Sequence, residues 1–576
     1  MIRELCDLND AFLGKIENYP KYGQSRVRNV DTVLCLSLKG DLTGIVSLVE
    51  TTQDEKGKIK SSNPFKIVPF QATRTSGIFP YFLCDTPMFI LGIDPEKGEL
   101  SEAKFKASAE LHKSVIGSAN SVCGKAILSF FEKWKVSEAF DNPIIKGYMG
   151  SFRGSIIFRV DGMDALDDDV LWDCWMTHFQ SRLAEKQMCT VLGKELPAVT
   201  VHPKINGMFD GPSTGSSLVS FNNPVFESYG MSKNANARIS DYAAYSYSTA
   251  LNYMLSDSRF RIGANTFVCW AVSAEPEYHE FFINLLDASA IKSIDQEDIK
   301  NMFRRISSGL PVEFNEKKLD SDVDFYILGM VPNNGRLSVS YFTHNTFGKI
   351  LENIIHHYER LAIICGKAVV GPFRLLNELL LPGGKSSDIP VWLSADFLDS
   401  IISNTRYPES VYTKIISRIM ADRNVNSIRA AFIKAYLLKN SSDNRKKEVA
   451  EVKLNNKSDY QPYVLGRLFA VLENVQRAAN GAGTIKDRFF DSACATPSIA
   501  FPSVLLLANK HLKTLERKDK PGLARYFEEQ IVDIMSLLGK SFPSHLTLEE
   551  QGVFIIGYYH QINSIEKKEE TDESDR

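Results

Sequence analysis

Six aspartates between residues 161 and 173 form the most conspicuous group of side chains that could bind a divalent metal ion. They are Asp161, Asp164, Asp167, Asp168, Asp169 and Asp173. Metal-dependent nucleases hold their ions with carboxylates that converge from rigid elements. These aspartates instead follow one turn and the start of an expected helix, where the helix dipole favours acidic side chains. The pattern favours a solvated helix start, and a metal-dependent nuclease remains the alternative function.

Two further segments resemble catalytic motifs without completing them. The segment 381–387 ends like a phosphate-binding loop, but Leu379 stands where the first glycine would be and no strand is expected before it. His356 and His357 are adjacent, so they point in different directions on a helix and lack the spacing of a zinc-binding pair. The nine cysteines are scattered and none stands in CxxC spacing. We therefore expect a protein that is not an enzyme and that has no catalytic residues, metal ion or cofactor.

A basic and polar stretch between residues 56 and 76 has the composition of a segment that contacts a DNA duplex. Lysine and arginine suit the phosphate backbone, whereas a glutamine amide suits base edges. The predicted nucleic-acid-binding residues here are Lys58, Lys60, Lys66, Gln71, Thr73, Arg74, Thr75 and Ser76. A solvated hairpin tip would have the same composition.

A second candidate segment, residues 221–230, combines amides, aromatic rings and a glycine. Asparagine can pair with base edges, and aromatic side chains can wedge between bases or stack on them. The predicted binding residues are Asn222, Asn223, Phe226, Ser228 and Tyr229, with Lys233 and Arg238 downstream for phosphates. The structural alternative is an Asn-Asn-Pro turn with Phe226 in the core.

Charge and hydropathy exclude several classes of protein. The 576-residue chain has a formal net charge of −3, so it has no overall basic coat, although residues 421–520 carry an excess of lysine and arginine. That excess fits either nucleic acid or an acidic protein partner. No apolar run approaches the ~20 residues that a membrane helix needs, and the N-terminus is charged where a secretion signal would be apolar. We expect a cytoplasmic protein without a membrane partner.

The hydrophobic period changes along the chain and predicts the elements that position these segments. Strand-like runs, such as 32–38, 154–162 and 325–330, alternate with helices up to about residue 345, and helical spacing dominates afterwards. The predicted fold class is α+β, a mixed α/β N-terminal region followed by an all-helical C-terminal region. The predicted domains are an α+β region over 1–345, a helical connecting region over 346–449, a helical bundle over 450–563 and an acidic disordered tail over 564–576.

Four ordered blocks of sequence together point to a known family. The blocks are Phe70–Asp85, Leu218–Gly230 with its continuation to Asn252, Asn424–Ala435, and a C-terminal set that runs from Leu465–Glu473 through Ala493–Pro497 to Gly557–Gln561. In these blocks the chain resembles the large subunit of the type I-C CRISPR interference complex, Cascade. The resemblance covers nearly the whole chain, and the C-terminal set is its most specific part.

The resemblance implies a non-catalytic subunit of an RNA-guided surveillance complex in antiviral defence. Such a subunit recognises the PAM, a short motif beside the target, in double-stranded DNA, and it promotes duplex opening and R-loop formation. This matches a division of labour in which protein reads the PAM and base pairing reads sequence. The partners so implied are target DNA, CRISPR RNA, the backbone and guide-end subunits, the small subunit and the helicase-nuclease, for which the large subunit offers a docking surface.

The resemblance also implies that the 450–563 bundle is similar to the small subunit of the complex. In type I-C systems that subunit is also made by internal translation of the same gene. Here Met420 lies too early and Met535 too late, so a separate product would need a non-AUG start near residues 450–460. A third possible function is a helical scaffold that binds only protein. The local basic segments argue against it, because they suit contact with nucleic acid.

Overall fold

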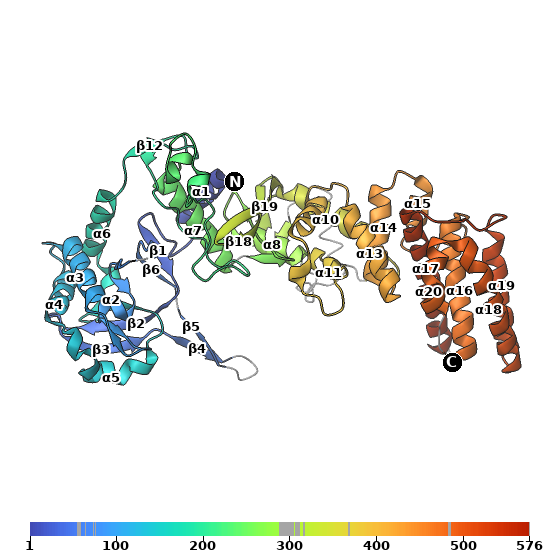
Figure 1. The fold of residues 1–576 in the computed structure, drawn as a ribbon, viewed down its shortest axis with the longest axis horizontal. Coiled ribbons are helices and arrows are strands. Elements are labelled where there is room, and N and C mark those ends of the chain that lie inside the picture. The colour runs from blue at the N-terminus through green and yellow to red at the C-terminus, as the bar shows by residue number, and fades with distance from the viewer. Residues whose placement is uncertain are drawn as a thin grey trace. The chain divides into compact units, whose positions relative to one another are not determined.

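The structure is a computed structural model that describes the chain apart from residues 54–58, 64, 73, 75–76, 258, 287–304, 306–311, 315–316, 367–368, 482–484 and 575–576. The chain divides into two compact units, shown in Figure 1. The first unit contains Met1–Ser256 and Pro332–Leu337, and the second contains Asp257–Val331 and Ser338–Arg576. The predicted α+β class, with a mostly helical C-terminal region, is confirmed. The division between the units lies well before the predicted boundary at residue 345.

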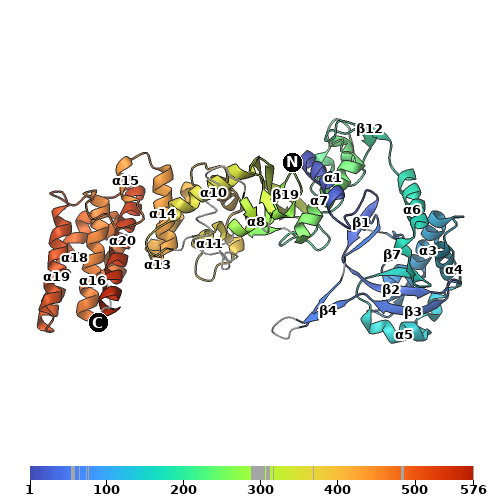
Figure 2. The same cartoon turned by 180° about the vertical axis from the view of Figure 1, so that it is seen from behind.

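A five-stranded sheet forms the centre of the first unit. Its middle strand β2 (Val30–Leu36) pairs antiparallel with β3 (Leu42–Ser47) and parallel with β10 (Ser155–Val160). Because β2 is apolar and buried along almost its whole length, it needs cover on both faces. In both views α3 and α4 lie on one side of the sheet and α5 on the other (Figure 1, Figure 2). The other elements of this part are β7 (Cys84–Asp85), α2 (Pro87–Ile90), β8 (Ile93–Asp94), β9 (Glu99–Leu100), α3 (Glu102–Ile116), α4 (Val122–Lys133), α5 (Pro143–Tyr148), β11 (Met163–Asp164) and α6 (Asp169–Ser181).

Two antiparallel ribbons and a helix pair complete the first unit. Strand β1 (Gln24–Val27) pairs with β6 (Lys66–Pro69), and a separate hairpin of β4 (Glu50–Gln53) and β5 (Ile59–Ser62) projects away from the sheet in both views (Figure 1, Figure 2). Helices α1 and α7 are joined by side-chain hydrogen bonds such as the one from the Tyr242 hydroxyl to Asp10, at 2.6 Å. The remaining elements are α1 (Ile2–Lys15), β12 (Lys186–Met188), β13 (Glu195–Pro197), η4 (Pro224–Phe226), η5 (Lys233–Asn236) and α7 (Asp241–Asp257).

The second unit begins with a four-stranded sheet in the order β14-β15-β18-β19. Strand β15 (Asn265–Ala271) is buried at every position, because helices and loops cover the sheet. The hairpin of β18 and β19 continues past this sheet to a tip, Pro332–Leu337, that belongs to the first unit. The other elements up to residue 402 are β14 (Phe260–Ile262), α8 (Pro276–Leu286), β16 (Val312–Phe314), β17 (Lys317–Leu319), β18 (Asp324–Asn333), β19 (Arg336–Thr346), α10 (Phe347–Leu361), α11 (Pro372–Asn377) and α12 (Val391–Ile402).

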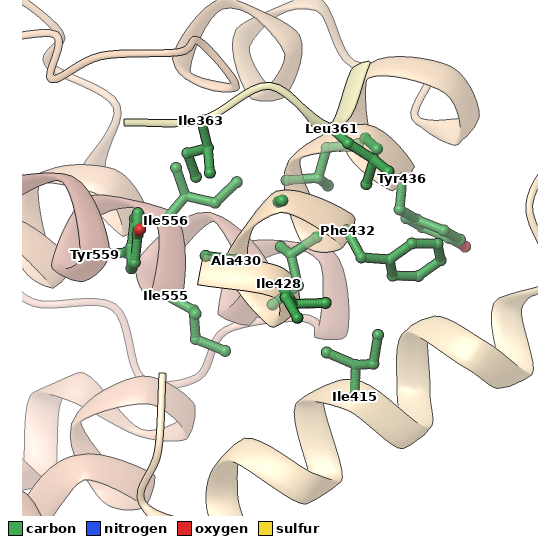
Figure 3. Packing of buried hydrophobic residues seen from close by; sticks show 14 of the residues in the cluster. Leu361, Ile363, Ile415, Ile428, Ala430, Phe432, Tyr436, Ile555, Ile556 and Tyr559 are labelled. Carbon is green, nitrogen blue, oxygen red and sulfur yellow. The ribbon is translucent and has the colours of Figure 1, made fainter. Parts of the chain in front are cut away.

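One apolar core runs from the sheet of the second unit into its C-terminal helices. Ile428, Ala430 and Phe432 of α14 lie close to Ile555 and Ile556 of α20, as Figure 3 shows. The packing therefore does not break at the predicted boundary between residues 449 and 450. The helices of this part are α13 (Glu409–Asp422), α14 (Ser427–Asn440), α15 (Asn444–Val449), α16 (Gln461–Asn480), α17 (Ile485–Ala495), α18 (Pro497–Arg517), α19 (Pro521–Ser536) and α20 (Leu548–Ser574).

Helices α16 and α20 pack with their backbones almost in contact. A Cβ atom on Gly466 would lie 2.0 Å from the Phe554 carbonyl oxygen, and one on Gly557 would lie 2.2 Å from that of Tyr463. Only glycine permits so close an approach. Both glycines belong to the C-terminal blocks that carry the sequence resemblance, so packing explains this part of the pattern.

Helix α20 starts with a capping box and extends further than expected. The Thr547 backbone N–H donates to the Glu550 carboxylate at 2.8 Å, and the Glu550 N–H donates to the Thr547 hydroxyl at 3.4 Å. The helix continues to Ser574, across most of the tail that the sequence predicts to be disordered. The tail contains no glycine or proline and is rich in glutamate and lysine, which favour helix. Among the described residues, no helix is long and apolar enough to cross a membrane.

Candidate nucleic-acid interface

The loop of residues 221–238 displays apolar side chains to solvent. Val225, Phe226 and Tyr229 are 83%, 43% and 97% exposed. The short helix η4 holds the first two, because the Asn223 side chain caps it by accepting from the Val225 N–H at 3.0 Å. Phe226 is thus not a core residue, although the Asn-Asn-Pro turn of the structural alternative is present at the start of η4. Clustered exposed apolar side chains are typical of a surface that contacts a partner.

A buried network of neutral polar groups fixes the C-terminal half of this loop. His202 donates from Nε2 to the Asn234 side-chain oxygen at 2.8 Å and accepts at Nδ1 from the Tyr247 hydroxyl at 2.9 Å. The Asn234 amide in turn donates to the Ile239 carbonyl at 2.9 Å. Burial lowers the pKa of His202, so its imidazole is neutral at neutral pH. The network ties η5 to α7, and sequence reasoning had given no role to either His202 or Asn234.

The two predicted phosphate ligands flank this anchor. Lys233 and Arg238 are both exposed, and both have left-handed backbones, with φ of +48° and +49°. Such a conformation is unusual for residues other than glycine and requires support from the surrounding structure. Buried Asn234 between them provides that support, since the Arg238 N–H donates to its carbonyl at 2.8 Å.

Arg336, at the tip of the β18–β19 hairpin, holds the N-terminal half of the loop. It donates a hydrogen bond to the Asn222 side-chain oxygen, and its guanidinium lies 3.9 Å from the centre of the Phe226 ring. This arginine fixes two of the predicted binding residues from a segment more than 100 residues away. No local pattern in the sequence points to it.

The other predicted segment is organised around Arg74. Its guanidinium forms an ion pair with Asp85 and lies 3.7 Å from the Tyr81 ring centre, and its Nε donates to the Phe79 carbonyl at 2.6 Å. Burial raises the pKa of Asp85, and the neighbouring Arg74 opposes that rise. Arg74 therefore already has an anionic partner within the protein. Gln71 is engaged as well, since its amide donates to the Cys84 carbonyl at 2.8 Å.

The remaining predicted residues occupy several places. Lys66 lies in β6 and is half-buried, and Lys60 lies in β5. The Ser228 backbone N–H donates to the Asn236 side chain at 2.9 Å. Lys58, Thr73, Thr75 and Ser76 lie outside the described residues.

The sequence model of a family of CRISPR-associated proteins, Cas_Csd1, matches residues 5–565. The chain belongs to this family. The match confirms the resemblance derived from the four blocks and makes the chain a Cascade-type protein of CRISPR defence, which works with other CRISPR-associated proteins and with nucleic acid. A search of curated proteins found no match.

In this Cas_Csd1 protein two of the six aspartates of the alternative hypothesis, Asp164 and Asp168, have local structural roles. Asp168 caps α6 by accepting from the Val170 N–H at 2.9 Å, and its second oxygen accepts from the Ser121 hydroxyl at 2.6 Å. Asp164 forms an ion pair with Arg159. Within the described ranges, no group of three or more histidine, cysteine or acidic side chains is arranged to hold a metal ion.

Proposed function

We propose that this Cas_Csd1 protein is the non-catalytic large subunit of a type I-C surveillance complex, and that its 221–238 loop recognises the PAM in double-stranded target DNA. The observation that carries the proposal is the exposure of Val225, Phe226 and Tyr229 on a loop that buried groups hold in place. Proteins that read and kink a duplex insert apolar side chains between base steps, with amides nearby to read base edges. Asn222 and Asn223 supply those amides.

The same loop suits the opening of the duplex. Unstacking a base step costs about a few kcal/mol, which contacts to the bent DNA must offset. Lys233 and Arg238 are placed to contribute phosphate contacts on either side of the anchor residue Asn234. In this proposal the opened strand then pairs with the CRISPR RNA, which reads the sequence.

The rest of the proposal concerns assembly. The partners are the backbone and guide-end subunits, the small subunit and the helicase-nuclease, which docks on this subunit to degrade the opened target. The subunit itself catalyses no reaction. A metal-dependent nuclease is a weaker candidate, because Asp164 and Asp168 serve an ion pair and a helix cap. If the purified chain cleaved DNA with magnesium, and the double variant Asp161→Asn/Asp167→Asn did not, the metal-dependent nuclease would become the better candidate.

The test separates base reading from phosphate contact. Asn223→Ser keeps a residue that can cap η4 but removes the amide donors. We expect it to weaken binding of a PAM-bearing duplex by about 5- to 100-fold, the equivalent of ~1–3 kcal/mol, and to leave a scrambled duplex unaffected. Lys233→Ala should weaken both duplexes and reduce the slope of log affinity against log salt by about 0.9.

The measurement is a titration of the assembled complex with both duplexes at several salt concentrations. The matched control is Lys106→Ala, an exposed lysine of α3 that pairs with Glu102 on its own helix. Equal losses on the two duplexes for Asn223→Ser would contradict the assignment of PAM recognition to this loop.

A further inference from the structure

A cleft of 720 Å³ in the first unit has no role in the proposed PAM contact. Its walls come from the β1–β6 ribbon, the end of α6, the segment 201–206 and α7. The volume is within the range of ligand-binding pockets, about 300–1,000 Å³. The side chains that define its chemistry are Arg26, Phe65, Tyr81, Arg182, Lys204 and Tyr253.

Aromatic rings and guanidinium planes alternate along the wall of this cleft. The Arg26 guanidinium lies 3.6 Å from the centre of the Phe65 ring and 4.9 Å from that of Tyr253. The Tyr81 ring, also in the wall, lies under Arg74. Proteins that bind single strands stack unpaired bases on such aromatic faces and arginine planes.

The cleft is also positively charged. Arg26, Arg182 and Lys204 line it, whereas Asp241 is its sole carboxylate among the described lining residues. Asp241 accepts a hydrogen bond from the Tyr22 hydroxyl at 2.7 Å, and burial raises its pKa. The balance of charge favours an anionic ligand such as a phosphate.

Short contacts connect the cleft to the 221–238 loop. The Lys204 ammonium donates to the Ser217 hydroxyl at 2.7 Å, and Ser217 forms a β-bridge with Arg336. Arg336 is the residue that holds Asn222 and Phe226. The cleft wall and the 221–238 loop are therefore connected through Lys204, Ser217 and Arg336.

We propose that this cleft captures an unpaired nucleotide of the DNA strand that is displaced when the duplex opens. The base stacks against the Phe65, Arg26 and Tyr253 wall, and Arg182 and Lys204 neutralise its phosphates. Capture of an unstacked base recovers part of the free energy that opening costs. The inference rests on the proposed function and adds a second site to it, which acts after the PAM has been recognised.

The test compares two PAM-bearing duplexes, one fully paired and one with a short unpaired stretch in the displaced strand. Phe65→Leu removes a stacking face but keeps an apolar side chain, and we expect it to weaken binding of the unpaired duplex about tenfold. Arg182→Gln should reduce the salt slope for that duplex by about 0.7, the value for one single-strand phosphate contact. The fully paired duplex carries the PAM but no match to the CRISPR RNA, so it stays closed, and neither change should affect it.

The control substitution is Arg3→Gln, which removes an exposed arginine of α1 that pairs with Asp7 and lies outside the cleft. It should change neither affinity. Equal losses on both duplexes for Phe65→Leu would overturn the inference, as would tighter binding of an RNA version of the unpaired strand.

A photocrosslink on the unmodified chain tests the same inference without a variant. With 5-iodouracil in the unpaired stretch, we expect the crosslinked peptide to contain Phe65, Tyr81 or Tyr253. A crosslink confined to other peptides would overturn the site. If Asn223→Ser fails to discriminate the PAM while the crosslink still falls in the cleft, the loop assignment fails and the cleft assignment stands.

Discussion

Particular basic side chains of the two compact units lie in different environments. In the first unit Lys233 and Arg238 are exposed beside a loop that displays apolar side chains. In the second unit Arg429, Lys434 and Arg467 are all less than 7% exposed, although they belong to the 421–520 segment with its excess of lysine and arginine. These three cations are therefore not accessible to a binding partner. Charge counted along a sequence locates cations, but their burial decides whether a partner can reach them.

The buried cations of the second unit have partners inside the protein. Arg429 forms ion pairs with Glu378 and Asp422, each at 2.9 Å. The Lys434 ammonium donates to the Arg360 carbonyl at 2.9 Å. Since an unpaired buried charge is costly, these contacts offset part of the free energy that burial of the cations costs. The cations are thus engaged inside the protein and do not serve binding.

The largest expected effect comes from breaking the Arg429 pairs. Arg429→Ala removes the ion-pair partner of Glu378 and one of the two arginine partners of Asp422, and both carboxylates are partly buried. We therefore expect it to lower the free energy of unfolding of the second unit by ~3–5 kcal/mol. Urea unfolding followed by circular dichroism measures this loss. The matched control is Arg445→Ala, whose 57% exposed side chain pairs with Asp459. It should cost at most about 1 kcal/mol, and an equal cost for the two variants would contradict the contrast between buried and exposed cations.

A stabilising substitution sharpens the same comparison. Burial lowers the pKa of Lys434 to about 8 from an unfolded value of 10.5. The unfolded chain therefore binds more protons between these values, and the stability of the protein rises with pH across that window. Lys434→Met should remove this rise and stabilise the protein at neutral pH by about 1–3 kcal/mol. Urea titrations over a pH series test it, and a less stable variant at neutral pH would show that the hydrogen bond to Arg360 outweighs desolvation.

The His202–Asn234 network that holds the 221–238 loop consists of neutral groups. Its stability should therefore depend on pH in a lower range than that of the buried Lys434. Asn234→Ala leaves His202 without its acceptor and should cost about 1–3 kcal/mol locally. Hydrogen exchange of residues 228–238 should become faster, with little change in α16 or α20. Because burial lowers the pKa of His202, its contribution is present above 6.5 and is lost as the pH falls below that value. Loop exchange that is indifferent to acid would argue against the network as the anchor.

The smallest effect concerns the cap of α20. Thr547→Ala should destabilise the second unit by about 1 kcal/mol, because the first turn loses a capping hydrogen bond. Thermal unfolding measures the change, and Ser503→Ala, at an exposed position within α18, is the control. DNA binding should not change, and a loss of affinity in Thr547→Ala would show that the start of α20 contributes to a nucleic-acid contact.

Much of the secondary structure could be predicted, because the pattern that specifies a strand or helix lies within a short stretch of sequence. Strand-like runs located β2, β10 and β18, and helical spacing predicted the helical region that contains α16. The contacts that organise the candidate site are not local in this sense. Arg336 reaches Asn222 from a distant hairpin, and Arg74 is paired with Asp85 instead of being presented to solvent. Sequence composition identified the 221–230 segment as unusual, but only the folded chain shows that Phe226 is exposed and which groups hold it.

The close packing of α16 and α20 has a consequence for how the chain is made. Gly466 and Gly557 bring together two helices whose contacting residues lie about 90 positions apart in the sequence. Helix α20 is the later of the two to be synthesised. Until α20 emerges, the apolar faces of α14 and α16 that pack against it have no cover. Nascent chains with such faces are prone to aggregate. We therefore expect the second unit to complete its folding late in translation, whereas the sheet of the first unit has all its strands by residue 164.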